Sequence, residues 1–331
     1  MGEPFRIAVT RDIRRDDGTS QYDLSLLDAA GLEWEFLHED VKVLSPDDLD
    51  GYDALICFSP RAPRKAIATS DRLLLLARLG VGFDTIDVRA CTEHGVLVTI
   101  AADGVRRPMA SSAMAFVLAL AHQLPQKDRQ ARAGIWNRFA AGGTGLTGRT
   151  LGLIGVGNIG RDLVRLAEPW AMRLIACDPY APEPPAGVEL VDLETLLHGS
   201  DFVVVLCPLT DETRGLLDAD RLGLMKKTSF LINIARGPIV DQQAMTDAVR
   251  DGRIAGAALD VFEHEPVDPD DPLLALENVI LSPHAIGLTD EIYRASGESV
   301  SRSVLAVAGG RVPEYVVNRE VLTHPRLAGL K

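Results

Sequence analysis

The stretch TLGLIGVGNIGRDLVRLA, residues 150–167, decides the fold. It opens as an apolar run typical of a buried strand and closes with the spacing of an amphipathic helix. At the join, Gly155, Gly157 and Gly160 form the pattern GxGxxG, which permits a tight turn, close approach of the backbone to a pyrophosphate, and close packing of helix on strand. The helix N-terminus adds unpaired N–H groups and a positive dipole end. Two further loop residues are expected to contact the same ligand, namely Asn158 and Ile159.

The next apolar run, RLIACDPY, ends in Asp178, eighteen positions after Gly160 (178 − 160). A carboxylate at that place can accept hydrogen bonds from both ribose hydroxyls of an adenosine, and it would repel a 2′-phosphate. Pro179 and Tyr180 come next, so no arginine stands beside it to bind such a phosphate. The sequence therefore predicts NAD rather than NADP as the cofactor, and an aspartate that only caps a turn is the alternative.

Strand-like runs alternate with helix-like segments on both sides of this stretch. The second half of the chain holds six such runs: LGLIG, RLIACD, FVVVLCP, SFLINIA, IAGAALDV and NVILSPH. The first 100 residues hold FRIAVT, EWEFLH, DALICFS, LLLLARLG and LVTI. Between the two sets, PMASSAMAFVLALAHQL is expected to form a long helix with Pro108 at its first position. The alternation predicts parallel sheets flanked by helices.

The expected fold is therefore α/β, with two flavodoxin/Rossmann-like, doubly wound parallel-sheet domains and a cleft between them. A discontinuous substrate-binding domain would comprise residues 1–102 and 289–331. An NAD-binding Rossmann domain would comprise residues 103–288. The chain would cross between the domains twice, so a hinge is expected at the two crossings.

The composition narrows the classes of function and location. The chain has 331 residues, a formal net charge of −13 and four scattered cysteines. The charge argues against nucleic acid or an anionic membrane as a partner, because both require a basic face. The N-terminus lacks the pattern of a signal peptide, and single cysteines without a CxxC pair are typical of free thiols in a reducing cytoplasm. No spacing of metal ligands occurs, so we expect no metal.

An arginine stands at the end of one of the apolar runs. In FLINIARGPIVD, residues 230–241, Arg236 follows the strand and precedes Gly237 and Pro238. The carboxyl ends of parallel strands are where α/β sheets hold ligands, and a guanidinium can bind a carboxylate at two points. The residues alone leave two interpretations open, an anion-binding arginine or one that forms a salt bridge at the surface or between domains.

Several motifs occur in order along nearly the whole chain: LGVGFDTID, GVGNIG, CPLTDETRGLL, NIARGPIVD, ALDVFEHEP and ENVILSPHAIG. In this set the chain resembles the D-isomer-specific 2-hydroxyacid dehydrogenases, a family that includes phosphoglycerate, glycerate/hydroxypyruvate and D-lactate dehydrogenases. The resemblance implies an NAD-dependent oxidoreductase that interconverts a (D-)2-hydroxyacid and a 2-oxoacid by hydride transfer. It also implies a homodimer, for which the segment KDRQARAGIWNR with Trp136 is the expected contact.

The same resemblance implies the catalytic residues. Arg236 would bind the carboxylate and the C2 oxygen of the substrate. His284, in SPHAIG, would be the general acid/base, and Glu265, in DVFEHEP, would hydrogen-bond the far imidazole nitrogen and orient the ring. His264 stands next to Glu265 and is expected to lie at the surface or the rim.

Residues that contact cofactor and substrate also follow from the resemblance. Asp260, in ALDVF, would bind the nicotinamide carboxamide, unless it is only a structural residue at a strand end. The turn Gly80-Val81-Gly82 would offer its N–H groups to the substrate carboxylate, with a simple glycine turn as the alternative. The other expected cofactor contacts are Pro179, Cys207, Pro208, Thr213, Ile234, Ala235 and Gly287.

The chain departs from the family's pattern before the central helix, in TIAADGVRRPMASSAMA. Apolar residues stand in place of a polar cluster, and Ser111 stands where glutamate is common. Arg106 and Arg107 are additional cations near an expected helix N-terminus. They would suit a second anion of the substrate, such as a phosphate or a distal carboxylate, and Arg106 is the candidate for it. Salt bridges to the many carboxylates of the chain are the alternative.

Reduction of glyoxylate or hydroxypyruvate is the generic expectation, and three rival functions share the fold. A phosphite dehydrogenase has the same Arg/Glu/His set but goes with a lysine in the anion loop, where Val81 stands here. A formate dehydrogenase has glutamine as the partner of the histidine, where Glu265 stands here. An NAD-sensing binding protein, like the C-terminal-binding co-repressors, keeps much of the same site and is the rival from another class.

Overall fold

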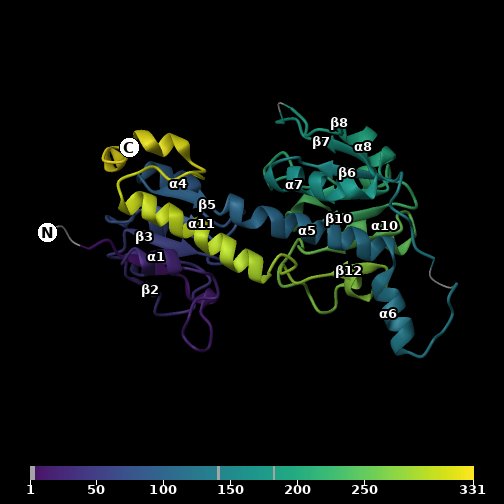
Figure 1. Cartoon of the computed structure of the whole chain (residues 1–331), viewed down its shortest axis with the longest axis horizontal. Helices are drawn as coiled ribbons and strands as arrows, with labels where there is room; N and C mark the ends of the chain where they lie inside the picture. Colours follow the sequence, from purple (N-terminus) through teal and green to yellow (C-terminus); the bar gives the residue numbers. More distant parts are fainter. Residues whose placement is uncertain (1–3, 140–141, 182) are drawn as a thin grey trace. The chain divides into compact units, whose positions relative to one another are not determined.

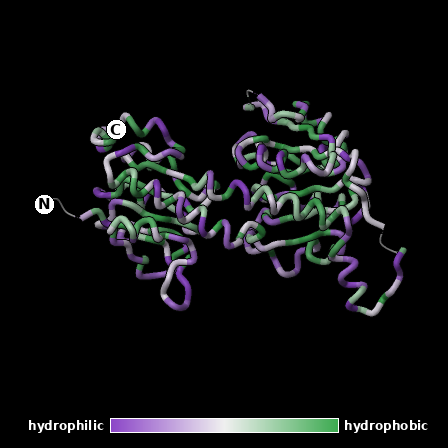
Figure 2. Tube along the Cα trace, viewed as in Figure 1, coloured by the Kyte–Doolittle hydropathy of each residue, from purple (hydrophilic) through white to green (hydrophobic). Residues whose placement is uncertain are grey.

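The computed structural model describes residues 4–139, 142–181 and 183–331. The chain divides into two compact units, Met1–Val105 with Leu288–Lys331 (unit 1) and Arg106–Gly287 (unit 2). Each unit is built on one parallel β-sheet (Figure 1). Figure 2 shows that the strands carry mainly hydrophobic residues, whereas the segments that connect them at the surface are largely hydrophilic.

The sheet of unit 1 has five parallel strands in the order β2-β1-β3-β4-β5. Ile7 in β1 pairs with Trp34 in β2 and with Ala54 in β3, so the chain begins inside the sheet and builds outward on both sides. This is the strand order of flavodoxin-like folds, as the alternation of strands and helices predicts. The strands are β1 (Ile7–Val9), β2 (Trp34–Phe36), β3 (Ala54–Cys57), β4 (Leu75–Arg78) and β5 (Leu97–Ile100).

Helices cover both faces of this sheet, because the strands are apolar on both sides. One face packs against α1 and α11, whose Leu27 and Val304 are fully buried beside the strand residues. The other face packs against α2, α3 and α4, with Leu49, Ile67 and Ala90 fully buried. The helices of unit 1 are α1 (Ser25–Ala29), α2 (Pro46–Leu49), α3 (Arg64–Ile67), α4 (Val88–Glu93) and α11 (Asp290–Ala308).

The sheet of unit 2 has seven parallel strands in the order β12-β11-β10-β9-β6-β7-β8. β6 pairs with β7 on one side and with β9 on the other, so the strand order reverses at β6. This is the Rossmann arrangement, in which a ligand binds at the carboxyl ends of the strands beside the point of reversal. The strands are β6 (Thr150–Ile154), β7 (Arg173–Cys177), β8 (Val188–Leu190), β9 (Phe202–Val205), β10 (Phe230–Asn233), β11 (Gly256–Leu259) and β12 (Val279–Leu281).

The expectation of six strands in this unit was wrong, because it missed β8. β8 pairs with β7 at the edge of the sheet over three residues, Val188 to Leu190. Val188 is the buried one of the three. A three-residue edge strand with one buried side chain contains no apolar run, so the sequence pattern carries no signal for it.

The helices of unit 2 are divided between the two faces of its sheet. α5 and α7 cover one face, where the stacked rings of Phe202 and Phe230 lie 5.4 Å apart. α8, α9 and α10 cover the other, where Leu196, Leu222 and Met245 are buried. These helices are α5 (Ala102–Ala121), α7 (Asn158–Ala167), α8 (Leu193–Gly199), α9 (Ala219–Leu222) and α10 (Gln242–Arg250).

The central helix starts earlier than the sequence indicated. α5 spans Ala102–Ala121, so Pro108 lies inside it and not at its first position. The first turn packs closely on α11, since a Cβ on Gly104 would come within 2.6 Å of the backbone of Ser296. The Asp103 carboxylate also accepts hydrogen bonds from two side chains of α11. These contacts hold the first turn in helical form, although Pro108 lacks the N–H that would otherwise bond to the carbonyl of Gly104.

The helix α6 (Leu124–Arg132) and the segment after it extend away from the sheet of unit 2 (Figure 1). The helix α6 ends within the segment KDRQARAGIWNR. It stops because Gly134 adopts a left-handed φ of 72°. The N–H groups of Gly134 and Ile135 then return to the carbonyls of Ala131 and Gln130, which is the Schellman pattern of helix ends.

Candidate active site

Three adjacent strands of unit 2 bring the expected catalytic residues to one edge of the sheet. β10, β11 and β12 are parallel neighbours in continuous register. The carboxyl ends of such strands lie along one edge. Arg236, Glu265 and His284 stand in the segments that follow β10, β11 and β12, respectively.

His284 and Glu265 form a hydrogen-bonded pair. Nδ1 of His284 lies 2.8 Å from Oε2 of Glu265, and Oε1 of Glu265 accepts the N–H of Phe262 at 3.0 Å. Burial alone would raise the pKa of Glu265, but these hydrogen bonds and the nearby charge of Arg236 lower it below the ordinary value of 4.5. The contribution of this carboxylate to stability is therefore complete above pH 4.5 and is lost as the pH falls through its lower folded-state pKa. The pair leaves Nε2 as the nitrogen that can exchange a proton with a substrate.

The backbone at His284 is in the left-handed region, with φ 55°. A residue with a Cβ is seldom found there, and such positions concentrate at functional sites. Asp260, which follows β11 and is 3% exposed, holds this segment: its Oδ1 accepts the N–H of Ala285 at 2.8 Å and of Ile286 at 2.9 Å. Asp260 thus supports the conformation that presents His284, and its expected contact with the nicotinamide carboxamide stays a prediction.

Arg236 lies in the turn after β10, and a residue that the motif analysis did not single out holds this turn. Asn233, which is 1% exposed, accepts the N–H of Ala235 at 3.0 Å and donates to the carbonyl of Arg236 at 3.0 Å. Gly237 then packs on the segment after β11, where a Cβ would lie 1.8 Å from the carbonyl oxygen of Phe262. A polar residue at the end of an apolar strand was the one available signal for Asn233, because buried amides need partners.

The glycine loop after β6 has the geometry that a pyrophosphate requires. Gly155 has φ 94°, and a Cβ there would lie 2.8 Å from the backbone nitrogen of Cys207. A Cβ on Gly160 would lie 2.9 Å from the carbonyl oxygen of Gly155, whereas Gly157, the N-cap of α7, has nothing within 4 Å. A side chain at position 157 would fill the space in front of the helix N-terminus, so these residues fit a bound dinucleotide. The first two residues of α7 are Asn158 and Ile159.

Asp178 directly follows β7 and faces the glycine loop. Its Oδ2 accepts the N–H of Val156 at 2.9 Å, and its Oδ1 accepts the N–H of Tyr180 at 3.0 Å. The side chain therefore caps its own turn and ties that turn to the loop. A carboxylate has about four acceptor positions, so it can still accept hydrogen bonds from ribose hydroxyls. Asp178 can therefore cap its turn and also bind a ribose, so the two interpretations are compatible.

The segment after β9 contributes further expected cofactor residues. The Thr213 hydroxyl donates to the carbonyl oxygen of Pro208 at 2.7 Å. The hydroxyl of Tyr180 donates to Glu212 in this segment at 2.5 Å, a contact for which the sequence held no signal. Burial raises the pKa of the Cys207 thiol to about 11, so it stays protonated near neutral pH. The other expected contacts lie after β7, β10 and β12, namely Pro179, Ile234, Ala235 and Gly287.

The expected substrate-binding residues are distributed over both units. The turn of residues 80–82 is half-buried and follows β4 in unit 1. Arg107 pairs with Asp162 of α7, which is 1% exposed, with Nε 2.9 Å from Oδ2 and Nη2 3.1 Å from Oδ1. This pair matches the salt-bridge interpretation for Arg107. Arg106 is exposed on α5, and its role stays a prediction.

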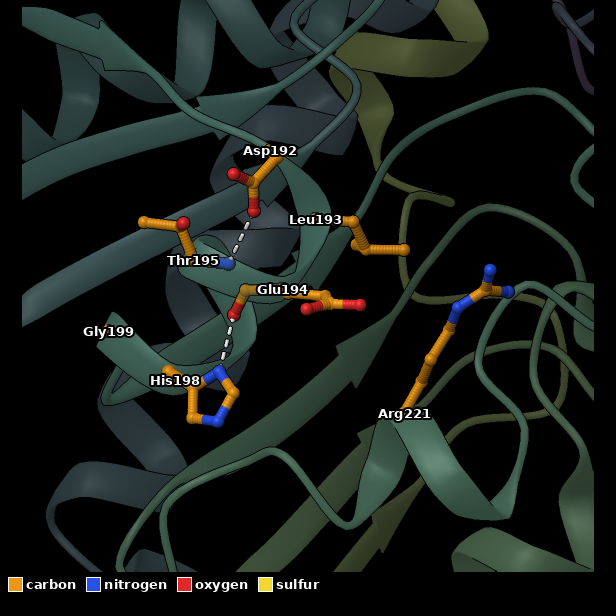
Figure 3. Close-up of a pocket in the computed structure, with 7 residues that line it drawn as sticks. All are labelled: Asp192, Leu193, Glu194, Thr195, His198, Gly199 and Arg221. Atoms are coloured by element: carbon orange, nitrogen blue, oxygen red, sulfur yellow. Dashed lines mark hydrogen bonds between the residues drawn. The ribbon is translucent and has the colours of Figure 1, made fainter.

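A hollow of about 670 Å³ lies beside α8 on unit 2 (Figure 3). Its polar groups serve the helix itself: Asp192 accepts the N–H of Thr195 at 2.7 Å, and Nδ1 of His198 lies 2.9 Å from the carbonyl oxygen of Glu194. Arg221 of α9 also lines it. None of the expected site residues lines this hollow, so it is not the candidate active site.

Metal and membrane partners can be considered for the described residues, 4–139, 142–181 and 183–331. No group of three or more His, Cys, Asp or Glu side chains is arranged to hold a metal ion there. No helix there is both long and apolar enough to cross a membrane.

The model of the D-isomer-specific 2-hydroxyacid dehydrogenase family, NAD-binding domain, matches residues 114–285. This stretch is more than half of the 331 residues, and it contains the glycine loop and all three expected catalytic residues. The chain belongs to the D-isomer-specific 2-hydroxyacid dehydrogenase family. It is therefore an NAD-dependent oxidoreductase. The family resemblance of its motifs is confirmed, and so are the two α/β domains built on parallel sheets.

Relatives within this family cover nearly all of the chain. A D-3-phosphoglycerate dehydrogenase from Methanocaldococcus jannaschii is 38% identical over 307 residues, which are 92% of this chain and 57% of that protein, so the chain spans little more than half of its length. A glyoxylate reductase from Thermococcus onnurineus is 37% identical over 301 residues, 87% of this chain and 90% of that protein. A crystal structure of D-lactate dehydrogenase from Aquifex aeolicus, complexed with NAD and lactic acid, has a TM-score of 0.81 at 26% identity and covers 92% of this chain and 96% of that one.

Proposed function

We propose that this member of the family interconverts a (D-)2-hydroxyacid and the corresponding 2-oxoacid with NAD, through Arg236, Glu265 and His284. The observation that carries the proposal is the 2.8 Å contact between His284 Nδ1 and Glu265 Oε2, on the sheet edge that also holds Arg236. Reversible oxidation of an alcohol next to a carboxylate needs a proton acceptor and a cation, and this edge provides both.

Each of the three residues has a separate task. The guanidinium of Arg236 binds the substrate carboxylate and C2 oxygen, and its charge stabilises the negative charge that develops on that oxygen during reduction. His284 accepts the hydroxyl proton at Nε2 in the oxidation and returns it in the reduction. Glu265 holds Nδ1, orients the ring and stabilises the imidazolium that forms. Bound NAD accepts or supplies the hydride.

The cofactor would be held by the residues already placed around the glycine loop. The N–H groups at the start of α7 would bind the pyrophosphate, and Asp178 would accept the ribose hydroxyls. The N–H groups of residues 80–82 in unit 1 would bind the substrate carboxylate. The open space before Gly157 and the half-buried glycine turn support these assignments.

The proposed substrates are glyoxylate or hydroxypyruvate, since glyoxylate reductases recur among the relatives. We expect the purified protein to oxidise NADH faster with these two compounds than with pyruvate, phenylpyruvate, phosphohydroxypyruvate or 2-oxoglutarate. The rates are measured by the loss of NADH absorbance. Preference for phosphohydroxypyruvate or 2-oxoglutarate would contradict the choice of substrate and would favour a second anion site at Arg106.

The same measurement separates the rival functions. Tight NADH binding without turnover of any 2-oxoacid would overturn the proposal in favour of an NAD-sensing binding protein. NAD reduction in the presence of phosphite would favour a phosphite dehydrogenase, against which Val81 in the anion loop argues. No contact among the described residues favours either rival over the dehydrogenase.

We also infer that two copies of the chain associate through residues 124–139, which comprise α6 and the segment after it. Large apolar side chains are exposed along this segment: Leu124 by 59%, Ile135 by 53%, Trp136 by 83% and Phe139 by 94%. Clustered exposed apolar residues of this size mark interaction surfaces. A reducing cytoplasm is the proposed location, because all four cysteines are free thiols.

Replacing Trp136 with serine is expected to shift the protein from dimer towards monomer, because the largest exposed ring of the segment would be lost. Light scattering coupled to size-exclusion chromatography measures the mass at several concentrations. Trp170→Ser is the matched control, since Trp170 is 40% exposed elsewhere on unit 2. A monomeric wild type, or a Trp136 variant that stays dimeric at low concentration, would contradict the inference.

A further inference from the structure

Arg78, the last residue of β4, ties two neighbouring segments of unit 1 together. Its Nε donates to the carbonyl oxygen of Gly82 at 2.9 Å, and its Nη1 donates to the carbonyl oxygen of Cys57 at 3.5 Å. The guanidinium carbon lies 5.9 Å from the centre of the Phe58 ring. One half-buried side chain thus connects the turn of residues 80–82 to the end of β3.

The turn of residues 80–82 depends on such a connection. Two of its three residues are glycines, which have the greatest conformational freedom in an unfolded or loosely held segment. The carbonyl of Gly80 accepts the N–H of Ala101 at 2.9 Å, which anchors the start of the turn by main chain alone. The carbonyl of Gly82 is held by Arg78, which anchors its end by a side chain.

The segment to which Arg78 ties the turn is itself held by hydrogen bonds from its backbone. The N–H of Phe58 donates to the Thr10 hydroxyl at 3.1 Å, and the N–H of Ser59 donates to the Asp12 carboxylate at 2.8 Å. β1, β3 and β4 are adjacent in the sheet, so these contacts all lie at the carboxyl edge of the sheet. Arg78 therefore connects the glycine-rich turn, by hydrogen bonds, to the segment after β3.

We propose that Arg78 is a positioning residue for the substrate: by holding the carbonyl of Gly82 it orients the N–H groups of residues 80–82 toward the carboxylate of the 2-oxoacid. The proposal rests on the proposed function, in which this turn binds that carboxylate. A guanidinium can donate to two carbonyl groups from its planar fork, which the single ammonium group of lysine cannot reproduce. Loss of the fork should therefore weaken substrate binding even where the positive charge is kept.

Steady-state kinetics of Arg78→Gln and Arg78→Lys test the proposal, with NADH and the 2-oxoacid that the wild type reduces best. We expect KM for the 2-oxoacid to rise about tenfold or more in both variants, which corresponds to a lost charge-assisted hydrogen bond. The Kd of NADH, measured by fluorescence, should stay unchanged, because the glycine loop belongs to unit 2. The kcat at saturating 2-oxoacid should change by less than about threefold, since only binding is weakened.

Arg89→Gln is the matched control, because Arg89 lies in the same unit on α4 with its side chain 86% exposed and paired to Glu93. Its kinetics should equal those of the wild type. Unchanged KM in Arg78→Gln would overturn the proposal, and so would full recovery of KM in Arg78→Lys, since charge alone would then suffice. A rise in KM that is matched by equal losses of kcat and of NADH affinity, together with a lowered Tm, would also overturn it, because Arg78 would then serve only general stability.

The outcome also distinguishes this proposal from the proposed function. If the wild type turns over normally and KM is unchanged in the variants, only the role of Arg78 is rejected, and the proposed function stands. Absence of wild-type turnover with every 2-oxoacid would reject the proposed function, and the role of Arg78 with it. Should Arg78→Gln fail to fold, the milder Arg78→Lys provides the same comparison of KM with kcat.

Discussion

Replacing His284 with alanine is expected to lower kcat for 2-oxoacid reduction by about 10²- to 10⁴-fold, the usual contribution of a general acid or base. The variant lacks the proton donor for the C2 oxygen, and water must replace it. Glu265 then loses its 2.8 Å partner. NADH binding should stay intact, because the glycine loop follows β6 and does not contact His284 through any described hydrogen bond. Single-turnover measurements with NADH fluorescence report binding and chemistry separately.

His198→Ala is the matched control, because His198 is an exposed histidine on α8 of the same unit. Its turnover should equal that of the wild type. A His284→Ala variant with kcat within about tenfold of the wild type would contradict the proposed role, since acid–base catalysis contributes more than that. The kcat of the Glu265→Gln variant should lie between those of His284→Ala and the wild type, because an amide still contacts Nδ1 but cannot stabilise the imidazolium.

Replacing Gly237 with alanine is expected to impair both activity and stability, although no role in binding the substrate is assigned to this residue. The added Cβ would lie 1.8 Å from the carbonyl oxygen and 1.9 Å from the carbonyl carbon of Phe262, and 2.5 Å from the nitrogen of Glu263. All three are backbone atoms, so either the Arg236 turn or the segment that leads to Glu265 must move. We expect kcat/KM to fall by about 10²-fold, as for a misplacement of about 1 Å, and the protein to lose about 1–3 kcal/mol or more from overpacking.

Gly145→Ala is the control for this substitution. Gly145 lies in the same unit, and a Cβ there would have nothing within 4 Å. Its kcat/KM and Tm should match those of the wild type. Thermal unfolding and steady-state kinetics are measured on both variants in parallel. A Gly237→Ala protein with wild-type kcat/KM would show that the contact with Phe262 relaxes without moving the catalytic residues.

Much of the fold could be predicted from local pattern. Apolar runs that alternate with helical segments specify parallel sheets, and GxGxxG after such a run marks the strand at which the order reverses. The exceptions are local features that are stabilised by contacts with segments distant in the chain. β8 is too short to form an apolar run, and Pro108 lies inside a helix because Gly104 and Asp103 bind the first turn to α11.

The expected catalytic residues came from the family resemblance of the motifs, and the pattern of strands explains why they lie together. Arg236, Glu265 and His284 each follow a strand, and parallel neighbours bring their carboxyl ends together without further information. What holds these residues could not be found in that way. Gly237 is 25 positions from Phe262 (262 − 237), and the two meet only because β10 and β11 are paired. The same applies to Arg107 and Asp162, which are 55 positions apart.

By itself, the order of residues determined the class of the fold, the glycine loop, and the types and positions of the proposed catalytic side chains. The fold class and the loop depend on short-range periodicity and spacing, whereas the proposed catalytic side chains follow from the family resemblance of the motifs. The tertiary structure alone decided the hydrogen-bond partners of those side chains: Asn233 holding Arg236, Asp260 holding the backbone beside His284, and Arg78 holding Gly82. Such partners come together because segments distant in the chain pack against each other, and no local pattern encodes that packing.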